Sequence, residues 1–388
     1  MKRKLKFKKT SAILLVITAM FFGYNKWVFS WGLFDLFTDQ TFTQEGLEKV
    51  KEFNPETDIL YLPGLGGKDI FQASKDLSIT RKKEIRKFIY LYLTTGREYI
   101  KASICRSYDY MDIIQEILKE YPDIPSEIAV LPLLESGFNP MAVSKSNAIG
   151  LWQFLNNTSV YFGLKHDKWV EERRDIDKST RAACDHLRHL YNTFGSWDLA
   201  LAAYNGGGGQ IKRAMDKTGA SDIWELKKTG VLTKETEEYV PRYIALLIIY
   251  SNQKLFGLEK EIAKPEKEDT TLIKLEYAVD INEVSKHLEV PICTIKKYNP
   301  ELNRNITPLT VEDYSLRLPV KAAKDFEKKS SLLYKKNIKS VKRYTVKPGD
   351  TVSSIALNHK RNTSLLIKFN DLKKPYIIRP GQTLYIPQ

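Results

Sequence analysis

The stretch SEIAVLPLLESGFNPMAVSKSNAIGLWQFLNNT, residues 126–158, decides the fold and the chemistry expected of this chain. Pro125 and Ser126 form a helix-start signal, and the apolar residues that follow cover most of a helix surface, which predicts a buried helix. The helix ends in a carboxylate, Glu135, just before a turn at Gly137. Because burial penalises the ionised form, we expect a raised pKa for Glu135, which suits a general acid near neutral pH. Taken alone, the residue is better explained as a helix-end carboxylate that faces water.

Three ordered motifs resemble one enzyme family. ESGFNPMAVSKSNAIGLWQF resembles the signature of the soluble lytic transglycosylases, which share their core fold with goose-type lysozyme. AAYNGGGGQIKRA (202–214) and ETEEYVPRYIA (235–245) match the same family in the same order. Ordered motifs are far more specific together than singly. With the carbohydrate-binding repeat downstream, the chain resembles the membrane-bound lytic transglycosylases of the D type.

The resemblance implies a mainly α fold: a lysozyme-like, all-helical catalytic domain followed by small βααβ LysM-type modules. It also implies a lytic transglycosylase that cleaves the β-1,4 bond between N-acetylmuramic acid and N-acetylglucosamine in the glycan strands of peptidoglycan. The product would carry a 1,6-anhydromuramoyl end. The family motifs assign catalysis to Glu135 and substrate binding to five residues, Ser144, Gln153, Tyr204, Asn205 and Tyr239.

Three of the five substrate-binding residues also have a structural interpretation. Ser144 either hydrogen-bonds the carboxyl or a substrate N-acetyl group, or it caps a loop. Gln153 either contacts sugar or lies on a polar helix face. Tyr204 either hydrogen-bonds the Glu135 carboxyl or is a core tyrosine. The glycine run after Asn205 lacks the Lys-Ser/Thr pair of a nucleotide site, so it predicts a tight turn that lets Tyr204 and Asn205 face a cleft.

Further acidic residues compete for a catalytic role. Most glycosidases use two carboxylates that flank the scissile bond, and Asp175 and Asp177 are candidates for the second. The resembling family works with one, so we interpret both as residues at a helix N-terminus, where the helix dipole favours them. Glu235 is interpreted as a structural partner or helix-start residue, and Tyr239 as a second cleft tyrosine.

Composition limits the class of partner. The chain has 388 residues, 43% hydrophobic content and a net charge of +14, which indicate several domains and an anionic partner or surface. Since the sequence contains no zinc finger, P-loop or RNA-recognition motif, we expect a cell wall or membrane surface rather than nucleic acid. The widely spaced Cys105, Cys184 and Cys293 suggest neither a disulfide framework nor a metal cluster. The family resemblance implies neither a metal nor an organic cofactor, and we expect a monomer.

The N-terminus has the layout of an export signal. Six basic residues within the first nine positions precede a nearly unbroken apolar run over 11–24. We interpret residues 1–31 as a signal peptide or an uncleaved signal anchor, so N-terminal membrane association is one expectation. The rest of the chain would then be exported to the cell envelope, either into the periplasm or membrane-anchored facing the wall. Residues 32–79 form an N-terminal segment without assigned chemistry.

The remaining chain divides into a catalytic domain and two related modules. The catalytic domain is assigned to 80–260, a degenerate LysM-like repeat to 272–320 and a LysM domain to 343–388. The last two are treated as repeats because YAV, YN and LP in the first align with YTV, FN and IP in the second. The resemblance assigns glycan binding to Gly349, Asp350, Thr351 and Asn370. The first repeat lacks the Pro-Gly-Asp turn, so it is either a glycan-binding module or a spacer. The lysine-rich segment 321–342 between them is interpreted as a helical or loose tether whose charge run is solvated.

Two other functions stay open at this stage. A lysozyme-like peptidoglycan hydrolase would share the fold, the substrate and the first proton transfer. A non-catalytic wall-binding protein would leave Glu135 inert. Sequence physics does not separate the transglycosylase from the hydrolase, because both reactions begin with the same acid.

Overall fold

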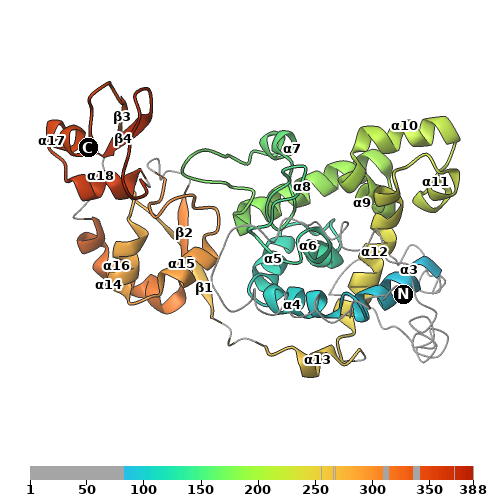
Figure 1. The fold of residues 1–388 in the computed structure, drawn as a ribbon. Coiled ribbons are helices and arrows are strands. Elements are labelled where there is room, and N and C mark those ends of the chain that lie inside the picture. The colour runs from blue at the N-terminus through green and yellow to red at the C-terminus, as the bar shows by residue number, and fades with distance from the viewer. Residues whose placement is uncertain are drawn as a thin grey trace, which may run out of the picture.

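The computed structural model describes residues 83–254, 256–264, 266, 268–308, 314–334, 341–370 and 372–387. The expected signal (1–31) and N-terminal segment (32–79) lie outside the described residues. Helices dominate, and they are followed by two small modules that each contain a pair of strands (Figure 1). The mainly α fold class is therefore confirmed.

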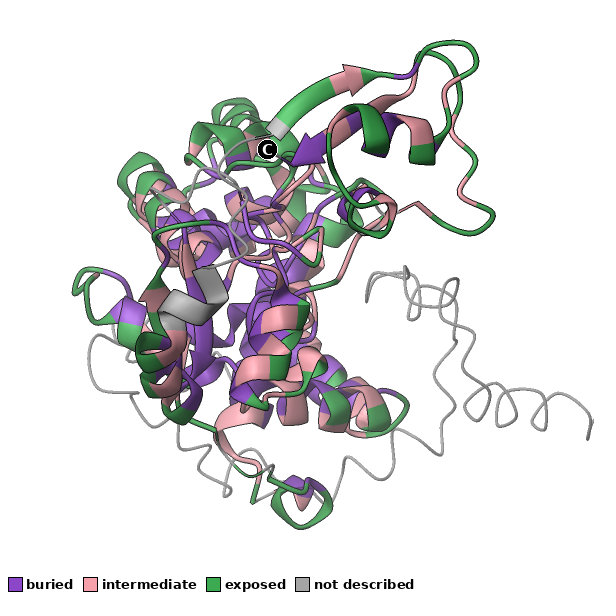
Figure 2. Ribbon diagram, turned by 90° about the vertical axis from the view of Figure 1, so that its left-hand side faces the viewer, coloured by how far each residue is buried: buried purple, intermediate pink, exposed green. Residues whose placement is uncertain are grey.

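The helical domain occupies one side of the molecule in Figure 1. Its helices are α3 (Lys83–Leu93), α4 (Arg97–Ser107), α5 (Met111–Leu118), the 3-10 helix η4 (Ser126–Val130), α6 (Leu131–Glu135), α7 (Asn156–Tyr161), α8 (Ile176–Phe194), α9 (Trp197–Gly206), α10 (Gly208–Thr218), α11 (Ile223–Thr229), α12 (Lys234–Ser251) and α13 (Leu258–Glu261). Most of them share one hydrophobic core, and Figure 2 shows the buried residues gathered along the inner faces of the helices.

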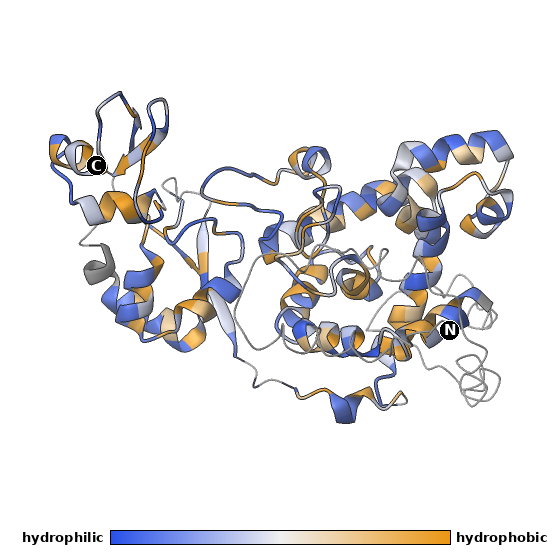
Figure 3. Ribbon diagram, in the orientation of Figure 1, coloured by the Kyte–Doolittle hydropathy of each residue, from blue (hydrophilic) through white to orange (hydrophobic). Residues whose placement is uncertain are grey.

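Helix α12 lies at the centre of that core. Every residue from Tyr239 to Ile249 is buried, and α12 packs against α3, α6 and α9. A helix that is buried on all sides must be surrounded by other elements, and Figure 3 shows the hydrophobic residues along α12. The first turn, before Tyr239, carries Glu235 and Glu237 and so is polar. The helix therefore enters the core from a polar end.

The buried helix predicted after Ser126 forms as two short pieces. Residues Ser126–Val130 are a 3-10 helix, and α6 starts at Leu131 with Pro132 in its first turn. Proline has no N–H to donate but is tolerated in the first turn of a helix, so a new helix starts here rather than continuing the old one. The burial prediction is confirmed: every residue from Ile128 to Leu134 is buried, and Glu135 is the last residue of α6.

The two C-terminal modules share the βααβ order that the sequence predicts. The first contains β1 (Thr270–Lys274), α14 (Ile281–Leu288), α15 (Ile292–Tyr298) and β2 (Ser315–Pro319). The second contains β3 (Val341–Thr345), α17 (Val352–Asn358), α18 (Thr363–Phe369) and β4 (Thr383–Pro387). In each module the two strands pair antiparallel over five residues.

An asparagine at the end of the second helix locks each module. Asn299 donates to the Arg317 carbonyl at 2.8 Å and accepts from the Arg317 N–H at 2.7 Å. Asn370 makes the same two bonds to Tyr385, at 2.8 and 2.7 Å. The predicted alignment of these asparagines is confirmed. The alignment of YAV with YTV is wrong, because Tyr277 follows β1, which ends at Lys274, whereas Tyr344 lies within β3.

The lysine-rich segment after the first module is in part a packed helix. Helix α16 (Val320–Tyr334) follows β2 directly, and its residues Ala322, Ala323 and Phe326 are buried in the core of the first module. The helical alternative for 321–342 is therefore confirmed over its first part, whereas the interpretation of that part as a solvated tether is wrong. The charge run conceals these three apolar residues, which fall on one helix face.

Candidate active site

Glu135 lies at the C-terminal end of α6 and faces a solvent-open pocket with a cavity volume of about 180 Å³. The pocket brings together all five residues predicted to bind substrate, although they come from three separate stretches of sequence. Its lining consists of Leu134, Glu135, Ser144, Ser146, Ala148, Gln153, Phe154, Leu155, Thr158, His186, Tyr204, Asn205, Glu235 and Tyr239.

The surroundings of Glu135 favour its protonated form. Desolvation raises the pKa of its carboxyl from 4.5 to about 7, the hydrogen bond from Tyr239 lowers it, and the nearby Glu235 carboxylate raises it. Desolvation is the largest cause because the apolar residues before Glu135, from Ile128 to Leu134, are buried. Near neutral pH the carboxyl therefore exists in both protonation states, as a group that donates and later accepts a proton requires.

The tyrosine that contacts Glu135 is Tyr239 rather than Tyr204. The Tyr239 hydroxyl, on α12, donates to Glu135 Oε1. The Tyr204 hydroxyl, on α9, donates to the Trp152 carbonyl at 2.8 Å. The predicted hydrogen bond from Tyr204 to the carboxyl is therefore wrong, although Tyr204 does line the pocket. Burial raises the pKa of both hydroxyls well above 10, so both remain neutral donors.

Ser144 and Gln153 belong to the loop that forms one side of the pocket, residues 144–155, which we call the cleft wall. The Ser144 hydroxyl accepts from the Ala148 N–H at 2.9 Å, which is the loop-capping alternative. Gln153 has φ of 49°, and its amide donates to the Gly150 carbonyl at 2.9 Å. Both side chains line the pocket while they support the wall backbone.

Asn205 ties the end of α9 to the start of α12. Its amide donates to Glu235 Oε1 at 3.0 Å, and its carbonyl accepts from the Thr236 hydroxyl at 3.1 Å. Gly206 permits this approach, because a Cβ there would lie 2.8 Å from Thr236 Oγ1. The glycine run forms the predicted tight turn, between α9 and α10 with Gly207 at φ of 85°, and Tyr204 and Asn205 line the pocket.

Two pocket residues were missed as site residues from the sequence. Glu235 was interpreted as structural, yet its carboxyl lines the pocket as well as starting α12. His186 on α8 lines the pocket with its ring centroid 5.0 Å from that of Tyr204, and burial lowers its pKa to about 4, which keeps the imidazole neutral. Its spacing of four from the buried Ala182 could have indicated an inward position.

The competing carboxylates Asp175 and Asp177 are not part of the pocket lining. Asp175 caps α8 by accepting from the Lys178 N–H at 2.8 Å, and Asp177 lies in the first turn of the same helix. Both positions agree with the interpretation as helix N-terminal residues.

The four residues predicted to bind glycan in the second module all support its backbone. Gly349 adopts φ of +84°, and Asp350 accepts from the Lys347 N–H at 2.7 Å. Thr351 caps α17 through a capping box, and Asn370 makes the strand contacts given above. Their contact with glycan stays a prediction.

Among the described residues, no group of three or more His, Cys, Asp or Glu side chains could hold a metal ion. In the same part of the chain, no helix is both long enough and apolar enough to cross a membrane. The three cysteines are free.

Comparison with known families gives three matches. The Transglycosylase SLT domain matches residues 112–227, the LysM-like domain of lytic transglycosylase MltD matches 269–335, and the LysM domain matches 344–387. The first match contains Glu135 and Tyr204 and ends before Tyr239. The other two cover the two βααβ modules.

Individual proteins are also similar to this chain. The membrane-bound lytic murein transglycosylase D of Escherichia coli K12 is 30% identical over 325 residues, which are 80% of this chain and 70% of the relative. A putative tributyltin chloride resistance protein of Alteromonas is 38% identical over 126 residues, 32% of this chain and 59% of that protein. Among solved structures, the 70 kDa soluble lytic transglycosylase of Escherichia coli is 16% identical to this chain. The match spans 52% of this chain and 40% of that structure, with a TM-score of 0.33.

Proposed function

The chain belongs to the membrane-bound lytic murein transglycosylase D family and is a peptidoglycan lytic transglycosylase with wall-binding modules, and we propose that Glu135 is the acid and base of its reaction. One observation carries this assignment: the Glu135 carboxyl faces the pocket with a pKa raised to about 7 and accepts a hydrogen bond from Tyr239. A carboxyl with that pKa can donate and reclaim a proton at neutral pH.

The first step is cleavage of the glycosidic bond. Protonated Glu135 donates to the oxygen that joins N-acetylmuramic acid to N-acetylglucosamine, and the C1–O bond breaks as the sugar acquires oxocarbenium character. The substrate's own N-acetyl oxygen stabilises the positive charge, so no protein nucleophile is required. Glu135 is left ionised in a desolvated site.

The second step closes the sugar on itself. Ionised Glu135 takes the proton from the C6 hydroxyl of the muramoyl sugar, and that oxygen attacks C1. The product is a 1,6-anhydro end, and Glu135 returns to its protonated state without consuming water. The sum of the two steps is one broken C–O bond and one formed C–O bond, so the proton balance closes on a single residue.

Tyr239 distinguishes the two carboxyl oxygens of Glu135. Its hydroxyl donates to Glu135 Oε1, and therefore Oε1 is held as an acceptor while Oε2 carries the transferred proton. A donor to the carboxylate also favours the ionised form, which offsets part of the desolvation and keeps the pKa near neutrality. Ser144, Gln153, Tyr204 and Asn205 would bind the sugars from the pocket lining.

The remaining assignments extend this function to the cell. The protein acts on the wall in the cell envelope, as its family implies. Residues 1–31 would direct export as a cleaved signal or a membrane anchor, 80–260 would form the catalytic domain, and 272–320 and 343–388 the two modules. The second module would bind glycan through Gly349, Asp350, Thr351 and Asn370, and the protein would act as a monomer.

Product analysis tests the proposal. The full chain is incubated with purified peptidoglycan, and the released muropeptides are weighed by mass spectrometry. We expect anhydro ends, which are lighter by one water than the reducing ends that a hydrolase leaves. Glu135→Gln should release about 10³-fold less product while its thermal unfolding matches that of the wild type. Reducing ends would favour the lysozyme-like hydrolase, and unchanged release by Glu135→Gln would identify another acid.

A further inference from the structure

The loop between α7 and α8 reaches from the helical domain to the C-terminal modules (Figure 1). Residues 165–175, which we call the bridging segment, form a narrow hairpin. The Glu172 N–H donates to the Lys165 carbonyl at 2.9 Å, and the Asp167 N–H donates to the Val170 carbonyl at 2.8 Å. The tip of the hairpin is Lys168 to Val170.

The tip is part of the first module. Val170 is 5% exposed, belongs to the hydrophobic core of that module and forms a β-bridge with Leu302. The Asn303 N–H donates to the Trp169 carbonyl at 2.9 Å, and the Glu171 N–H donates to the Glu301 carbonyl at 2.9 Å. Backbone pairing together with a shared core fixes the tip to the module.

The tip also touches the second module. The ring centroid of Trp169 lies 5.4 Å from that of Phe369 and 6.3 Å from that of Tyr385. Arg304, in the first module, donates to the Lys168 carbonyl at 3.2 Å and to the Phe369 carbonyl at 2.9 Å. One tryptophan and one arginine therefore join the bridging segment to both modules.

The base of the bridging segment holds the cleft wall. The buried Arg173 guanidinium donates to the Asn147 carbonyl at 3.3 Å and to the Phe154 carbonyl at 3.4 Å. Gly150 has φ of +90°, and a Cβ there would lie 1.9 Å from the Arg173 carbonyl oxygen. The backbones of wall and base are thus in contact, and the wall carries several of the residues that line the pocket.

Glu171 connects the tip to the base. Its carboxylate accepts two hydrogen bonds of 2.7 Å from the Arg173 guanidinium, a bidentate pair whose two side chains are 12% and 7% exposed. Its N–H donates to the first module, as described above. One continuous chain of hydrogen bonds therefore runs from the main chain of the first module, through Glu171 and Arg173, to the cleft wall.

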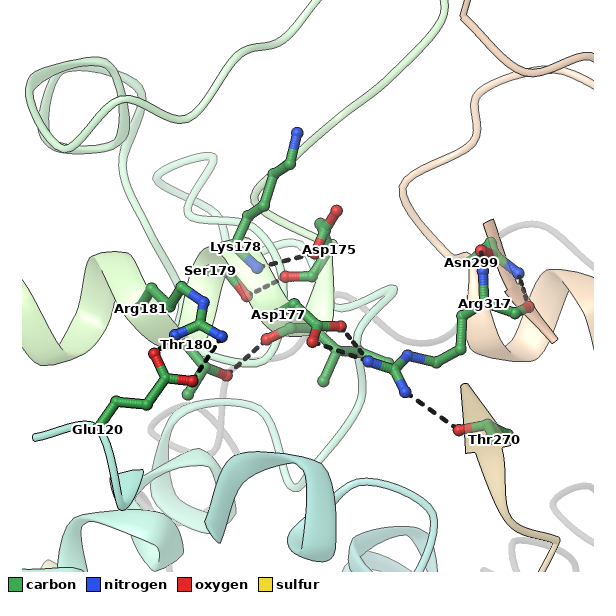
Figure 4. Close-up of polar contacts among 11 residues, drawn as sticks. Glu120, Asp175, Asp177, Lys178, Ser179, Thr180, Arg181, Thr270, Asn299 and Arg317 are labelled. Atoms are coloured by element: carbon green, nitrogen blue, oxygen red, sulfur yellow. Dashed lines mark hydrogen bonds and ion pairs between the residues drawn. The ribbon is translucent and has the colours of Figure 1, made fainter. Parts of the chain in front are cut away.

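A second contact fixes the orientation of the first module on the helical domain. Arg317 on β2 donates to both carboxylate oxygens of Asp177 on α8, at 2.8 and 2.6 Å (Figure 4). Lys297 on α15 pairs with Asp109, which precedes α5, at 2.6 Å. With the bridging segment, these contacts leave the module little freedom to rotate.

We propose that the bridging segment couples the docking of the modules to the conformation of the cleft wall, with Glu171 and Arg173 as positioning residues. Coupling between distant sites travels through packed and hydrogen-bonded elements, and this segment is such an element with one end in each site. Loosening the tip therefore loosens the wall, and the pocket is best ordered when the modules are docked. The activity readout below rests on the proposed function, whereas the exchange readout does not.

Hydrogen–deuterium exchange on the full chain tests the coupling directly. Trp169→Ala and the milder Arg304→Met both weaken the tip. We expect wall amides in 144–155 to exchange roughly threefold to tenfold faster, which lies within the roughly twofold to thirtyfold range that such couplings produce. Arg361→Met is the matched control, because Arg361 donates to the Pro387 carbonyl within the second module. It should leave wall exchange unchanged. Faster exchange at 165–171 with an unchanged wall overturns the proposal.

A double-variant experiment tests the route through Glu171. Turnover of a soluble glycan fragment is measured for Glu171→Gln, Arg304→Met and both together, with kcat and KM separated. We expect kcat to fall roughly threefold to tenfold in each single variant, and the double variant to be no slower than the slower single one. Multiplied effects would mean that the two residues act independently and would overturn the route. If the wild type were inactive, the exchange result would still decide the coupling.

Discussion

Carboxyl groups with raised pKa values occur at two places in the molecule. One is Glu135 in the cleft, and the other is the Glu301–Asp175 pair between the helical domain and the first module. Desolvation is the largest cause of the raised pKa in each case. Each site also supplies a tyrosine: Tyr239 donates to Glu135, and Tyr314 donates to Glu301 at 2.6 Å. By charge environment alone, the two sites are similar. They differ in access, because Glu135 lines a pocket and Glu301, which is 3% exposed, lies outside that lining.

The comparison teaches that a raised pKa becomes catalytic only where a substrate can reach the proton. At the module contact, the same physical effect instead makes docking depend on pH. Glu301 faces Tyr314 and Asp175, and Asp177, Glu172 and Lys178 add charges close to the pair. Protonation of either carboxyl relieves repulsion between them, so the pair favours docking when it holds a proton.

The largest expected difference between the two sites is in turnover. Glu135→Gln should lower kcat about 10³-fold, because general acid and base catalysis together contribute on that order. Glu301→Gln keeps the shape of the protonated acid and should lower kcat less than about threefold. Assays on one soluble glycan substrate compare them. Equal losses would show that the pocket does not distinguish the two carboxyls.

Tyr239→Phe should have the next largest effect. Loss of a hydrogen bond to a charged group is worth about 1.5–3 kcal/mol, so we expect a fall in kcat of roughly tenfold or more. Since the Tyr239 hydrogen bond lowers the pKa of Glu135, its removal should move the alkaline limb of the pH–rate profile to higher pH. Tyr204→Phe, which removes a donor to the Trp152 carbonyl, is the control and should leave the limb in place.

A smaller effect is expected on stability at the module contact. The raised pKa of Glu301 means that its contribution is present below the unfolded value of about 4.3 and is lost as pH rises through the folded value. Glu301→Gln removes this loss, so its Tm should exceed that of the wild type by ~2 °C or more at pH 9. The advantage should shrink toward pH 4. A constant difference across pH would contradict the linkage.

The smallest effect concerns the ion pair between Asp177 and Arg317, whose side chains are 21% and 9% exposed. A double-mutant cycle with Asp177→Asn and Arg317→Met should give a coupling free energy of about 1 kcal/mol, since partly exposed pairs are screened by water. Denaturant unfolding measures each corner. The exposed pair of Arg188 with Asp123 provides a reference cycle, which should give less.

The sequence predicts the local features of the site well. Glu135 follows from an apolar helix that ends in a carboxylate, and the five other pocket residues follow from the motif resemblance. The sequence did not predict that Tyr239 rather than Tyr204 contacts Glu135, because this contact depends on how α12 packs against α6 in three dimensions. Likewise, Glu235 satisfies two patterns at once, a helix start and a pocket wall, and only the first is visible in sequence.

Local sequence patterns did not predict the contacts between domains. The pairing of Asp177 with Arg317 joins residues 140 positions apart, and the first module gives no signal that its strand will meet α8. Trp169 and Val170 also carry no periodic signal, because they lie in a loop between two helices and bury themselves against another domain. Such contacts depend on assembly of elements that each fold by their own pattern.

The position of Val170 in the core of the first module has a practical consequence for dissection of this protein. A shortened chain that ended after α13 would leave Val170 and Trp169 facing water, and burial of one such side chain is worth roughly 1.5–3 kcal/mol. The shortened form would expose an apolar patch at the hairpin tip, and such a patch promotes aggregation. The helical domain is thus continuous in sequence yet not autonomous, and fragments of the enzyme should be cut so that this hairpin keeps its cover.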